Sequence, residues 1–461
     1  HSICVGVADR DAKLAKFVLD KEFENEISLL KIDPLVLEQH LSIVAVIGDR
    51  MKNHQGISGN MFSTLGKNNV NIRAIAQGAS ERNITAVIAD KDVKKALNCL
   101  HESFFEVETK QLNLFVMGVG NVGSTLLSQI EKQASYIQNT LKLKINIVGL
   151  SNSKLMAFDD SGIDLSQWQE TLANGEKTDL IEFFEKAKAL NLRNSMFVDI
   201  TANAAVAGTY EYYLKQSIAV IACNKIACSS NYEQYQNLKN LSRKYKAPFL
   251  FETNVGAGLP VIDTLNHLIA SGDRIRSIHA VLSGSLNFIF NNFNESTTFY
   301  EVVKQAQKEG YTEPDPRIDL SGKDVARKLL ILARESGYKL GMSDILNDGF
   351  LPEGALESSS VDDFYTLIKS KDEEFKTLLN SANNNDAKLK YVASFIDGKA
   401  NVGLQEVQAG HPFYNLEGKD NIVMFYTDRY TDQPLIIKGA GAGSEVTASG
   451  LFADIIRASN I

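Results

Sequence analysis

The alternation of apolar and polar residues divides the chain into predicted strands and helices. Near the amino terminus, residues 2–8 predict a strand and residues 9–24 an amphipathic helix with an aspartate at its start. A fuller unit follows, with strands predicted at 41–47, 70–75, 84–89 and 104–109 and helices at 56–68 and 91–100. The order βαββαβ gives a small sheet with helices on one face. The strand and helix predicted at residues 2–24 are typical of the C-terminal end of a second, partial unit of the same kind.

The middle of the chain alternates compact apolar strands with amphipathic helices. Strands are predicted at residues 112–117, 145–150, 197–201, 219–223 and 249–251, with a helix ending near residue 139. This alternation predicts an α/β, Rossmann-type, doubly wound sheet, in which the carboxyl ends of parallel strands border the ligand crevice.

The last third of the chain has a mixed pattern that predicts an α+β domain. Residues 276–291 predict a strand, a turn and a helix, and a second helix runs from Gly322 to about Leu332. Residues 341–385 are acidic and uneven, and the SSSVDD segment at 358–363 predicts a loop. Antiparallel strands are predicted at 389–396, 401–408, 422–426 and 434–437, before a glycine-rich turn and a final helix at 445–456.

Composition excludes several classes of protein. The chain has 461 residues, a net charge of −8 and no basic stripe, which argues against a nucleic-acid partner. No apolar run reaches the ~18 residues that a membrane span needs, and no signal peptide is evident. The four cysteines are scattered without CxxC spacing, as expected for reduced thiols in a cytoplasmic protein.

A glycine-rich segment directly follows the strand predicted at 112–117. It reads Gly118-Val119-Gly120-Asn121-Val122-Gly123 and leads into a helix. In this position Gly118 permits the tight turn, Gly120 lets the backbone approach a pyrophosphate, and Gly123 brings the helix against the strand. The sequence therefore predicts a dinucleotide site, against the alternative of a glycine-rich turn without a ligand.

Three further strand ends are expected to face the dinucleotide. The strand at 145–150 ends in Ser151-Asn152-Ser153-Lys154, without the acid that holds the ribose 2′-hydroxyl in NAD-selective proteins. Ser153 and Lys154 could instead meet a 2′-phosphate, so NADP is preferred or both cofactors are used. Thr201 and Lys225 follow the next strands and are expected near the nicotinamide half.

Residues 306–328, AQKEGYTEPDPRIDLSGKDVARK, place acids and a lysine close together. Prolines on both sides of Asp315 fix φ twice, so Glu313 lies on a stiff loop. Asp324 and Lys328 are four residues apart on a helix and share one face. The alternative is a capped helix with a surface pair worth about 0.3–0.5 kcal/mol.

The segment ETNVGAGLP at 252–260 contains two glycines and a proline, which suit an irregular turn. Carbonyl groups of such a turn could bind a monovalent cation, because hard cations favour oxygen ligands. The residues alone favour a plain crossing between domains.

Two stretches carry a first resemblance. VIGDRMKNHQGISGNMFSTL and NIRAIAQGASERNITAVI resemble an ACT domain, the amino-acid-sensing module of aspartate kinases. Residues 48–51 lie between a strand and a helix whose amino terminus could receive a ligand carboxylate. The resemblance implies Gln77 as a contact for an effector such as threonine. A packing or dimerisation module without a ligand is the alternative.

The longer motifs resemble the homoserine dehydrogenase family. GYTEPDPRIDLSGKDVARK fills the family signature, and VGVGNVG, NSK, CNK, ETNVGAGLP, LSGSL and GAGAG appear in the family's order. More closely, the chain resembles the C-terminal part of the bifunctional aspartokinase–homoserine dehydrogenases, without the kinase portion. The resemblance implies NAD(P)H-dependent reduction of aspartate 4-semialdehyde to homoserine.

The resemblance also implies roles for individual residues. Lys328 looks like the acid–base residue, with Lys225 as the other candidate, and Glu313, Asp319 and Asp324 look like substrate ligands. Gly441 and Gly443 of the final glycine-rich turn join Gly118 to Gly123, Ser153, Lys154, Thr201 and Lys225 at the dinucleotide. A sodium site is implied at Glu252, Val255, Ala257 and Leu259, which changes the interpretation of that segment.

The domain organisation follows from these assignments. We expect a partial ACT-like unit at 1–35, an ACT-like domain at 36–109, a nucleotide-binding domain at 110–258, a substrate-binding and dimerisation domain at 259–438, and a return to the nucleotide-binding domain at 439–461. A homo-oligomer, dimer or tetramer, is expected. One alternative function is a regulatory or assembly fragment in which the dehydrogenase is an inactive scaffold. The other is a different nucleotide-dependent oxidoreductase on the same fold.

Overall fold

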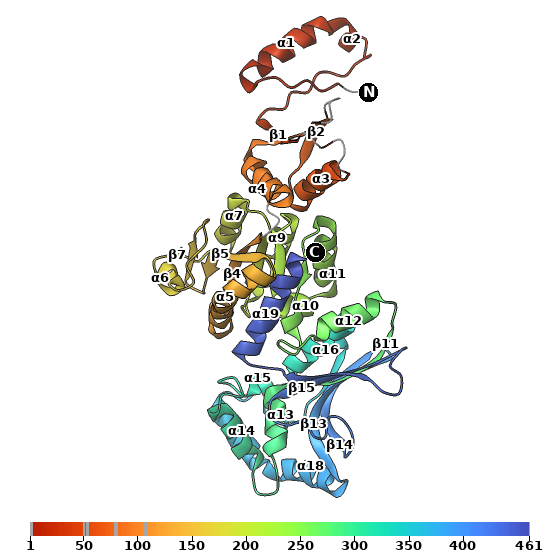
Figure 1. Ribbon diagram of the computed structural model, residues 1–461. Helices are drawn as coiled ribbons and strands as arrows, with labels where there is room; N and C mark the ends of the chain where they lie inside the picture. The colour runs from red at the N-terminus through yellow and green to blue at the C-terminus, as the bar shows by residue number, and fades with distance from the viewer. Residues whose placement is uncertain (1–2, 49–50, 52–54, 78–81, 106–108, 461) are drawn as a thin grey trace. The chain divides into compact units, whose positions relative to one another are not determined.

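The computed structural model describes residues 3–48, 51, 55–77, 82–105 and 109–460 (Figure 1). They form two compact units, one of residues 1–113, 137–144 and 187–194, and one of residues 114–136, 145–186 and 195–461. No helix in these described ranges combines the length and the apolar composition needed to cross a membrane.

The first unit contains a three-stranded antiparallel sheet. Its strands are β1 (Leu41–Ile47), β2 (Ile72–Gln77) and β3 (Asn83–Ala89), in the order β1-β3-β2, and its helices are α3 (Ile57–Lys67) and α4 (Val93–Phe104). Alternate residues of β3 are buried, and they pack with Met61 and Leu65 of α3 and with Ala96 and Leu100 of α4. The predicted strand at 104–109 is not observed at its described ends, and residues 106–108 lie outside the described part, as do Asp49 and Arg50.

The segment before this sheet differs from the prediction. Residues 3–8 form no strand, and the helices that follow are α1 (Ala12–Glu22) and α2 (Glu24–Ser28). Ile3 and Val5 belong to a largely apolar run, but their side chains are 92% and 68% exposed. A strand needs a neighbour for its backbone groups, and no described strand pairs with this segment, so the predicted strand is wrong.

A seven-stranded sheet contributes the nucleotide-binding fold. Its order is β10-β9-β8-β4-β5-β6-β7, and β9 is parallel to both of its neighbours. The strands are β4 (Lys110–Met117), β5 (Leu143–Ser151), β6 (Leu155–Phe158), β7 (Glu176–Lys177), β8 (Ser195–Asp199), β9 (Ala219–Ala222) and β10 (Phe249–Leu250). The glycine-rich turn leads from β4 into α5 (Asn121–Thr140), as predicted.

A second, six-stranded sheet follows in the order β12-β14-β13-β11-β15-β16. The strands are β11 (Ile275–Val281), β12 (Ile345–Asp348), β13 (Ala387–Ile396), β14 (Lys399–Gln408), β15 (Asp420–Thr427) and β16 (Leu435–Ala440). All pairings are antiparallel except that of β12 with β14. Helices α13 (Gly284–Asn292), α16 (Lys323–Glu335) and α18 (Asp372–Asn384) pack against β13. The loop predicted at 358–363 ends at Ser360, whose hydroxyl caps α17 (Val361–Ser370), so its second half is helical.

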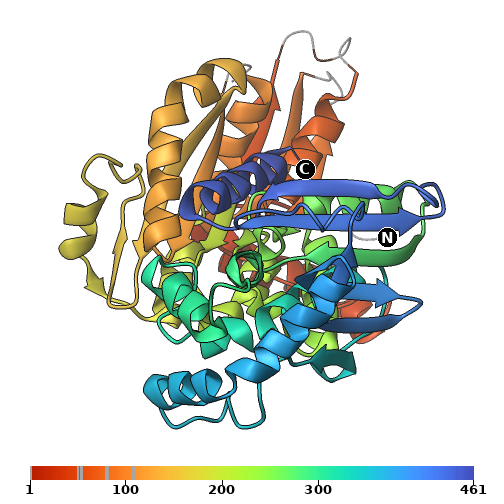
Figure 2. The same cartoon turned by 90° about the horizontal axis from the view of Figure 1, so that it is seen from below.

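The carboxyl terminus returns to the nucleotide-binding sheet. Figure 2 shows the last strand of the six-stranded sheet passing into α19 (Ser444–Ser459), both at the blue end of the colour range. Helix α19 packs against β9, and Gln129 of α5 donates a 3.0 Å hydrogen bond to Glu445. A Cβ atom on Gly258 would lie 2.3 Å from the carbonyl oxygen of Val446, so this close packing requires glycine.

Candidate active site

The glycine-rich turn after β4 has the geometry of a dinucleotide cradle. Gly118 has a φ of +102°, and a Cβ there would lie 2.8 Å from the backbone of Ile200. A Cβ on Gly123 would lie 2.0 Å from the carbonyl oxygen of Gly118, so the helix can approach the strand only with glycine. Around Gly120, in contrast, the described residues leave open space within 4 Å. The turn is therefore tight on its protein side and open where a ligand would approach.

The turn after β5 carries Ser153 and Lys154. The side chain of Asn152 accepts hydrogen bonds from the backbone N–H groups of Lys154 and Leu155, both at 2.8 Å, which fixes the shape of the turn. Ser153 and Lys154 are exposed. The Ser153 hydroxyl and the Lys154 ammonium are therefore exposed to solvent at the position where NAD-selective proteins carry an acid for the ribose 2′-hydroxyl.

A buried carboxylate organises the end of β8. Asp199 accepts hydrogen bonds from the Thr201 N–H at 2.7 Å, the Tyr210 hydroxyl at 2.6 Å and the Asn224 amide at 3.0 Å. Burial raises the pKa of the Asp199 carboxyl, and the hydrogen bonds from Tyr210 and Thr201 oppose that increase. Asp199 thereby fixes Thr201 and the residue before Lys225.

Asp324, in the first turn of α16, contacts two ammonium groups. Its Oδ2 atom is 2.9 Å from Lys328 Nζ, and its Oδ1 atom is 3.6 Å from Lys225 Nζ. Burial raises the pKa of the Asp324 carboxyl, but the charges of Lys328 and Lys225 outweigh it and hold this pKa well below its usual range. The Asp324 side chain is nevertheless 48% exposed, so a ligand can reach it.

Lys328 is held by a backbone carbonyl in addition to Asp324. Its Nζ atom donates a 2.6 Å hydrogen bond to the carbonyl oxygen of Leu282, at the end of β11. The Asn421 amide donates to the same oxygen at 3.3 Å. A Cβ atom on Gly441 would lie 1.9 Å from Asn421 Cγ, so the final glycine-rich turn approaches this amide closely. Lys328 and that turn are thus linked through a single asparagine.

A second polar group lies at the start of α13. Asp319 accepts a 2.8 Å hydrogen bond from the Ser285 hydroxyl and a 2.9 Å hydrogen bond from the backbone N–H of Glu313. The Glu313 side chain itself is exposed. The segment from Leu282 to Ser285 therefore contacts both Lys328 and Asp319. It links the Asp324–Lys328 pair to the loop that carries Glu313 and Asp319.

Helix α16 is fixed at both ends. Gly322, before its first residue, has a φ of +69°, and a Cβ there would lie 2.0 Å from the Tyr391 hydroxyl oxygen in β13. Near the other end, Arg334 is 3% exposed and donates hydrogen bonds of 2.7 Å to the carbonyl oxygens of Cys228 and Ser230. Cys228 lies in α10 (Ile226–Ser229), the helix that begins directly after Lys225. Helix α16 therefore connects the six-stranded sheet to the segment that carries Lys225.

The segment at 252–259 offers carbonyl oxygens to a cation. Val255 and Ala257 are buried, and the described residues donate no hydrogen bond to their carbonyl oxygens. Ala257 also has a φ of +53°, a left-handed conformation that is unusual for alanine. Such buried acceptors fit a hard cation.

The Glu252 carboxylate, in contrast, is already engaged. It accepts hydrogen bonds from the Ile262 N–H at 2.6 Å and the Asp263 N–H at 2.9 Å, and it pairs with Arg457 at 2.9 Å. Its backbone oxygen accepts a 3.2 Å hydrogen bond from the Val255 N–H, and its second lone pair is the site that a cation could use.

Comparisons with known proteins divide the chain in the same way. The model of the ACT domain matches residues 44–104, that of the homoserine dehydrogenase NAD binding domain residues 118–252, and that of homoserine dehydrogenase residues 260–456. A homoserine dehydrogenase of Schizosaccharomyces pombe is 34% identical over 356 residues, which cover 75% of this chain and 95% of that protein. The chain belongs to the homoserine dehydrogenase family.

Longer members of the homoserine dehydrogenase family match nearly the whole chain. A bifunctional aspartokinase/homoserine dehydrogenase of Haemophilus influenzae is 40% identical over 457 residues, 99% of this chain and 56% of that protein. A chloroplastic bifunctional enzyme of Zea mays is 40% identical over 464 residues and is covered over 50% of its length. The chain thus spans about half the length of these relatives.

Solved structures agree with this fold. A protein of unknown function from Candida auris superposes with a TM-score of 0.70 at 32% identity, and covers 76% of this chain and 99% of its own. A hyperthermophilic archaeal homoserine dehydrogenase in complex with NADPH gives a TM-score of 0.60 at 24% identity, with coverage of 76% and 98%, and shows the fold alone. The resemblances to the ACT domain and to homoserine dehydrogenase are confirmed, whereas the roles of individual site residues stay predictions.

Some residues that shape the candidate site were not predicted from the sequence. Ser285 donates a hydrogen bond to Asp319, and it lies in the LSGSL stretch, which could have pointed to it. Asn421 donates a hydrogen bond to the Leu282 carbonyl oxygen, and a lone asparagine gives no distinctive signal in a sequence. Asn421 is fully buried, and its Oδ1 atom has no hydrogen-bond donor among the described residues, which is rare away from ligand sites. Asp199 could have been found, because an acid at the end of a parallel strand borders the crevice.

Proposed function

We propose that this chain catalyses the NAD(P)H-dependent reduction of L-aspartate 4-semialdehyde to L-homoserine. The observation that carries the proposal is the pairing of Asp324 with both Lys328 and Lys225, on the chain that also bears the Gly118–Gly123 turn. The alternative of an inactive scaffold is disfavoured, because both the turn and this charged group are intact.

Lys328 is proposed as the proton donor. A bound nicotinamide dinucleotide supplies the hydride, and the substrate oxygen then needs a proton. The Lys328 ammonium can stabilise negative charge on that oxygen and donate the proton. Its contacts with Asp324 and the Leu282 carbonyl fix its position, so little reorganisation is needed during the reaction. Lys225 is the alternative donor.

The substrate ammonium is assigned to the acidic residues. Asp324 and the exposed Glu313 are proposed as its ligands, with Asp319 holding the Glu313 backbone in place. Because Asp324 already contacts two ammonium groups, Glu313 carries the larger share of the attraction. Neighbouring carboxylates would orient the aldehyde toward Lys328, and such positioning is a major part of catalysis.

NADP is proposed as the preferred dinucleotide. The Gly118–Gly123 turn would hold the pyrophosphate at the amino terminus of α5. Ser153 and Lys154 are exposed where an acid would select NAD, so they can contact a 2′-phosphate. Thr201 and Lys225 would border the nicotinamide, and Gly441 and Gly443 would approach the same ligand from the final turn.

A monovalent cation, sodium, is proposed at 252–259. The ligands would be the backbone oxygens of Glu252, Val255, Ala257 and Leu259. The buried carbonyl groups of Val255 and Ala257, which receive no hydrogen bond from the described part of the chain, support this set. The cation would be structural, since this segment packs against α19 through Gly258 and Gly450.

The ACT domain is proposed to sense an amino acid, with threonine as the candidate and Gln77 as an exposed contact. A homo-oligomer is also proposed. Ile43 and Ile47 are 70% and 74% exposed on one face of the three-stranded sheet, an apolar surface that a second copy could cover.

A steady-state assay of aspartate 4-semialdehyde reduction tests the proposal, with NADPH and NADH in parallel and with or without threonine. Turnover with either dinucleotide is expected, with a lower KM for NADPH. Absence of turnover with both dinucleotides in folded protein that still binds NADPH would favour the scaffold alternative.

A further inference from the structure

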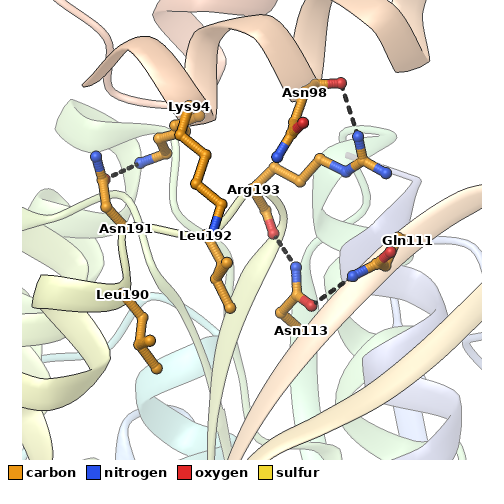
Figure 3. Close-up of a pocket in the computed structure, with 9 residues that line it drawn as sticks. Lys94, Asn98, Gln111, Asn113, Leu190, Asn191, Leu192 and Arg193 are labelled. Carbon is orange, nitrogen blue, oxygen red and sulfur yellow. Dashed lines mark hydrogen bonds between the residues drawn. The ribbon is translucent and has the colours of Figure 1, made fainter. Parts of the chain in front are cut away.

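A basic cavity of about 230 Å³ lies in the first unit, beside α4 (Figure 3). One wall is formed by Lys94, Lys95 and Asn98 of α4, and the other by the start of β4 and by residues 190–193. None of the described residues that line it is acidic, and three of them are cationic. One of the three, Arg193, lies 3.5 Å from the Glu102 carboxylate, so Lys94 and Lys95 give the cavity its basic character. In Figure 3 the Lys94 side chain extends from α4 into the space between Asn191 and Arg193. This cavity is separate from every residue assigned above to the dinucleotide or the substrate.

Lys95 is the best-defined group of the cavity. Its side chain is buried, and its Nζ atom donates a 2.9 Å hydrogen bond to Asn191 Oδ1. No described carboxylate makes an ion pair with it, because the nearby Asp92 instead accepts a 2.9 Å hydrogen bond from the Asn191 amide. An ammonium group has three N–H donors, so this one is incompletely satisfied. Burying a cation without a counter-ion is costly unless a ligand supplies the missing charge.

The protonation behaviour of Lys95 agrees with this geometry. Burial lowers its pKa, and the charge of Asp92 offsets only part of that decrease. A bound anion would favour the ammonium form.

The opposite wall is already ordered. Gln111 donates a 2.9 Å hydrogen bond to Asn113, which donates a 2.7 Å hydrogen bond to the carbonyl oxygen of Arg193. Arg193 in turn donates to the carbonyl oxygen of Asn98 at 2.7 Å. Both walls are therefore held in place by hydrogen bonds of the protein, as expected for a preformed ligand site.

We propose that this cavity binds a small oxyanion, the carboxylate or phosphate group of a molecule that fits within it, through Lys95 and Lys94. Such a ligand would connect α4 of the ACT domain to residues 190–193. It would stabilise the first unit, because a ligand that binds only the folded state raises the free energy of unfolding. The proposal does not depend on the dehydrogenase activity.

The test is thermal denaturation of the full chain with saturating NADPH, which keeps added anions out of the dinucleotide turn. Inorganic phosphate and succinate are titrated separately, against chloride at equal ionic strength. We expect a saturable increase in Tm with at least one of them, and the one that acts identifies the chemical class. Lys95→Met and Asn98→Asp should each raise the half-saturating concentration at least about tenfold, the effect of losing about 1.4 kcal/mol of binding free energy.

Lys67→Met is the matched control, because it removes an exposed lysine of the same unit that does not line the cavity. It should respond like the unmodified chain. Asn98→Asp changes an exposed position, so it keeps the test valid even where Lys95→Met fails to fold. A response to neither anion, or half-saturating concentrations in both cavity variants that match the control, would overturn the proposal.

Discussion

Replacing Lys328 with alanine is expected to abolish most turnover and to leave NADPH binding intact. The substitution removes the ammonium group that lies 2.9 Å from Asp324 and 2.6 Å from the Leu282 carbonyl oxygen. Loss of a positioned general acid lowers a rate by about 10²–10⁴-fold. That range corresponds to about 2.7–5.5 kcal/mol in the activation free energy. The dinucleotide turn is untouched, so the Kd for NADPH should not change.

The effect on folding is expected to be smaller. The Lys328 side chain is 10% exposed, so its removal deletes a buried, charged hydrogen bond worth about 1.5–3 kcal/mol. The Leu282 carbonyl oxygen keeps Asn421 as a donor, and Asp324 keeps Lys225 as a counter-charge. The loss is a fraction of the ~5–15 kcal/mol that stabilises a typical domain, so the variant should fold.

The assay measures kcat and KM from NADPH oxidation with aspartate 4-semialdehyde, and the Kd for NADPH from fluorescence quenching. Lys323→Ala is the control, because Lys323 is exposed and is the first residue of the same helix. Surface substitutions usually change stability by no more than about 0.5 kcal/mol, so the control should keep its rate within about twofold. A kcat within about tenfold of the unmodified chain for Lys328→Ala would refute the assignment. Lys225→Ala should then show the larger loss.

Four further predictions concern Glu313, two glycines and one buried lysine. Glu313→Gln should raise the KM for the semialdehyde more than it lowers kcat, and an unchanged KM would remove Glu313 from the amine site. Gly441→Ala should lower Tm and kcat, because the new Cβ would lie 1.9 Å from Asn421 Cγ and such overpacking costs about 1–3 kcal/mol. Gly120→Ala, which adds a Cβ in open space, should leave Tm unchanged and weaken NADPH binding, and equal Tm values for the two glycine variants would contradict this account. Burial lowers the pKa of Lys390 to about 8, so the unfolded chain binds more protons above this pH. The unmodified chain should therefore gain stability relative to Lys390→Met between about pH 8 and pH 10 in denaturant titrations, and parallel pH profiles would rule this out.

The sequence predicts an element reliably where neighbouring residues alone determine its conformation. The glycine-rich turn between β4 and α5 was identifiable because each glycine has its own steric reason, and the structure shows two of them, at Gly118 and Gly123. The strand predicted at residues 2–8 failed because alternation alone does not supply a pairing partner. The uneven pattern at 358–363 predicts a loop, whereas Ser360 caps α17, and a serine followed by acids is in itself a helix-start signal.

The candidate site was predictable only in part. The i, i+4 spacing of Asp324 and Lys328 gave their contact directly. The approach of Lys225 to Asp324 depends on the packing of α10 against α16, which the spacing of residues along the chain cannot show. The Leu282 carbonyl group was also invisible, because every residue carries a backbone oxygen and its use is decided by tertiary structure.

The double attachment of α16 has a consequence for the timing of catalysis. The start of α16 packs closely against Tyr391 of β13 at Gly322, and Arg334 binds the other end to the carbonyl groups that follow Lys225. The separation of Lys225 and Lys328 is therefore set when the chain folds, and it does not wait for a ligand to arrive. The proposed proton donor, Lys328, and the alternative donor, Lys225, would therefore need no rearrangement of α16 before a substrate binds.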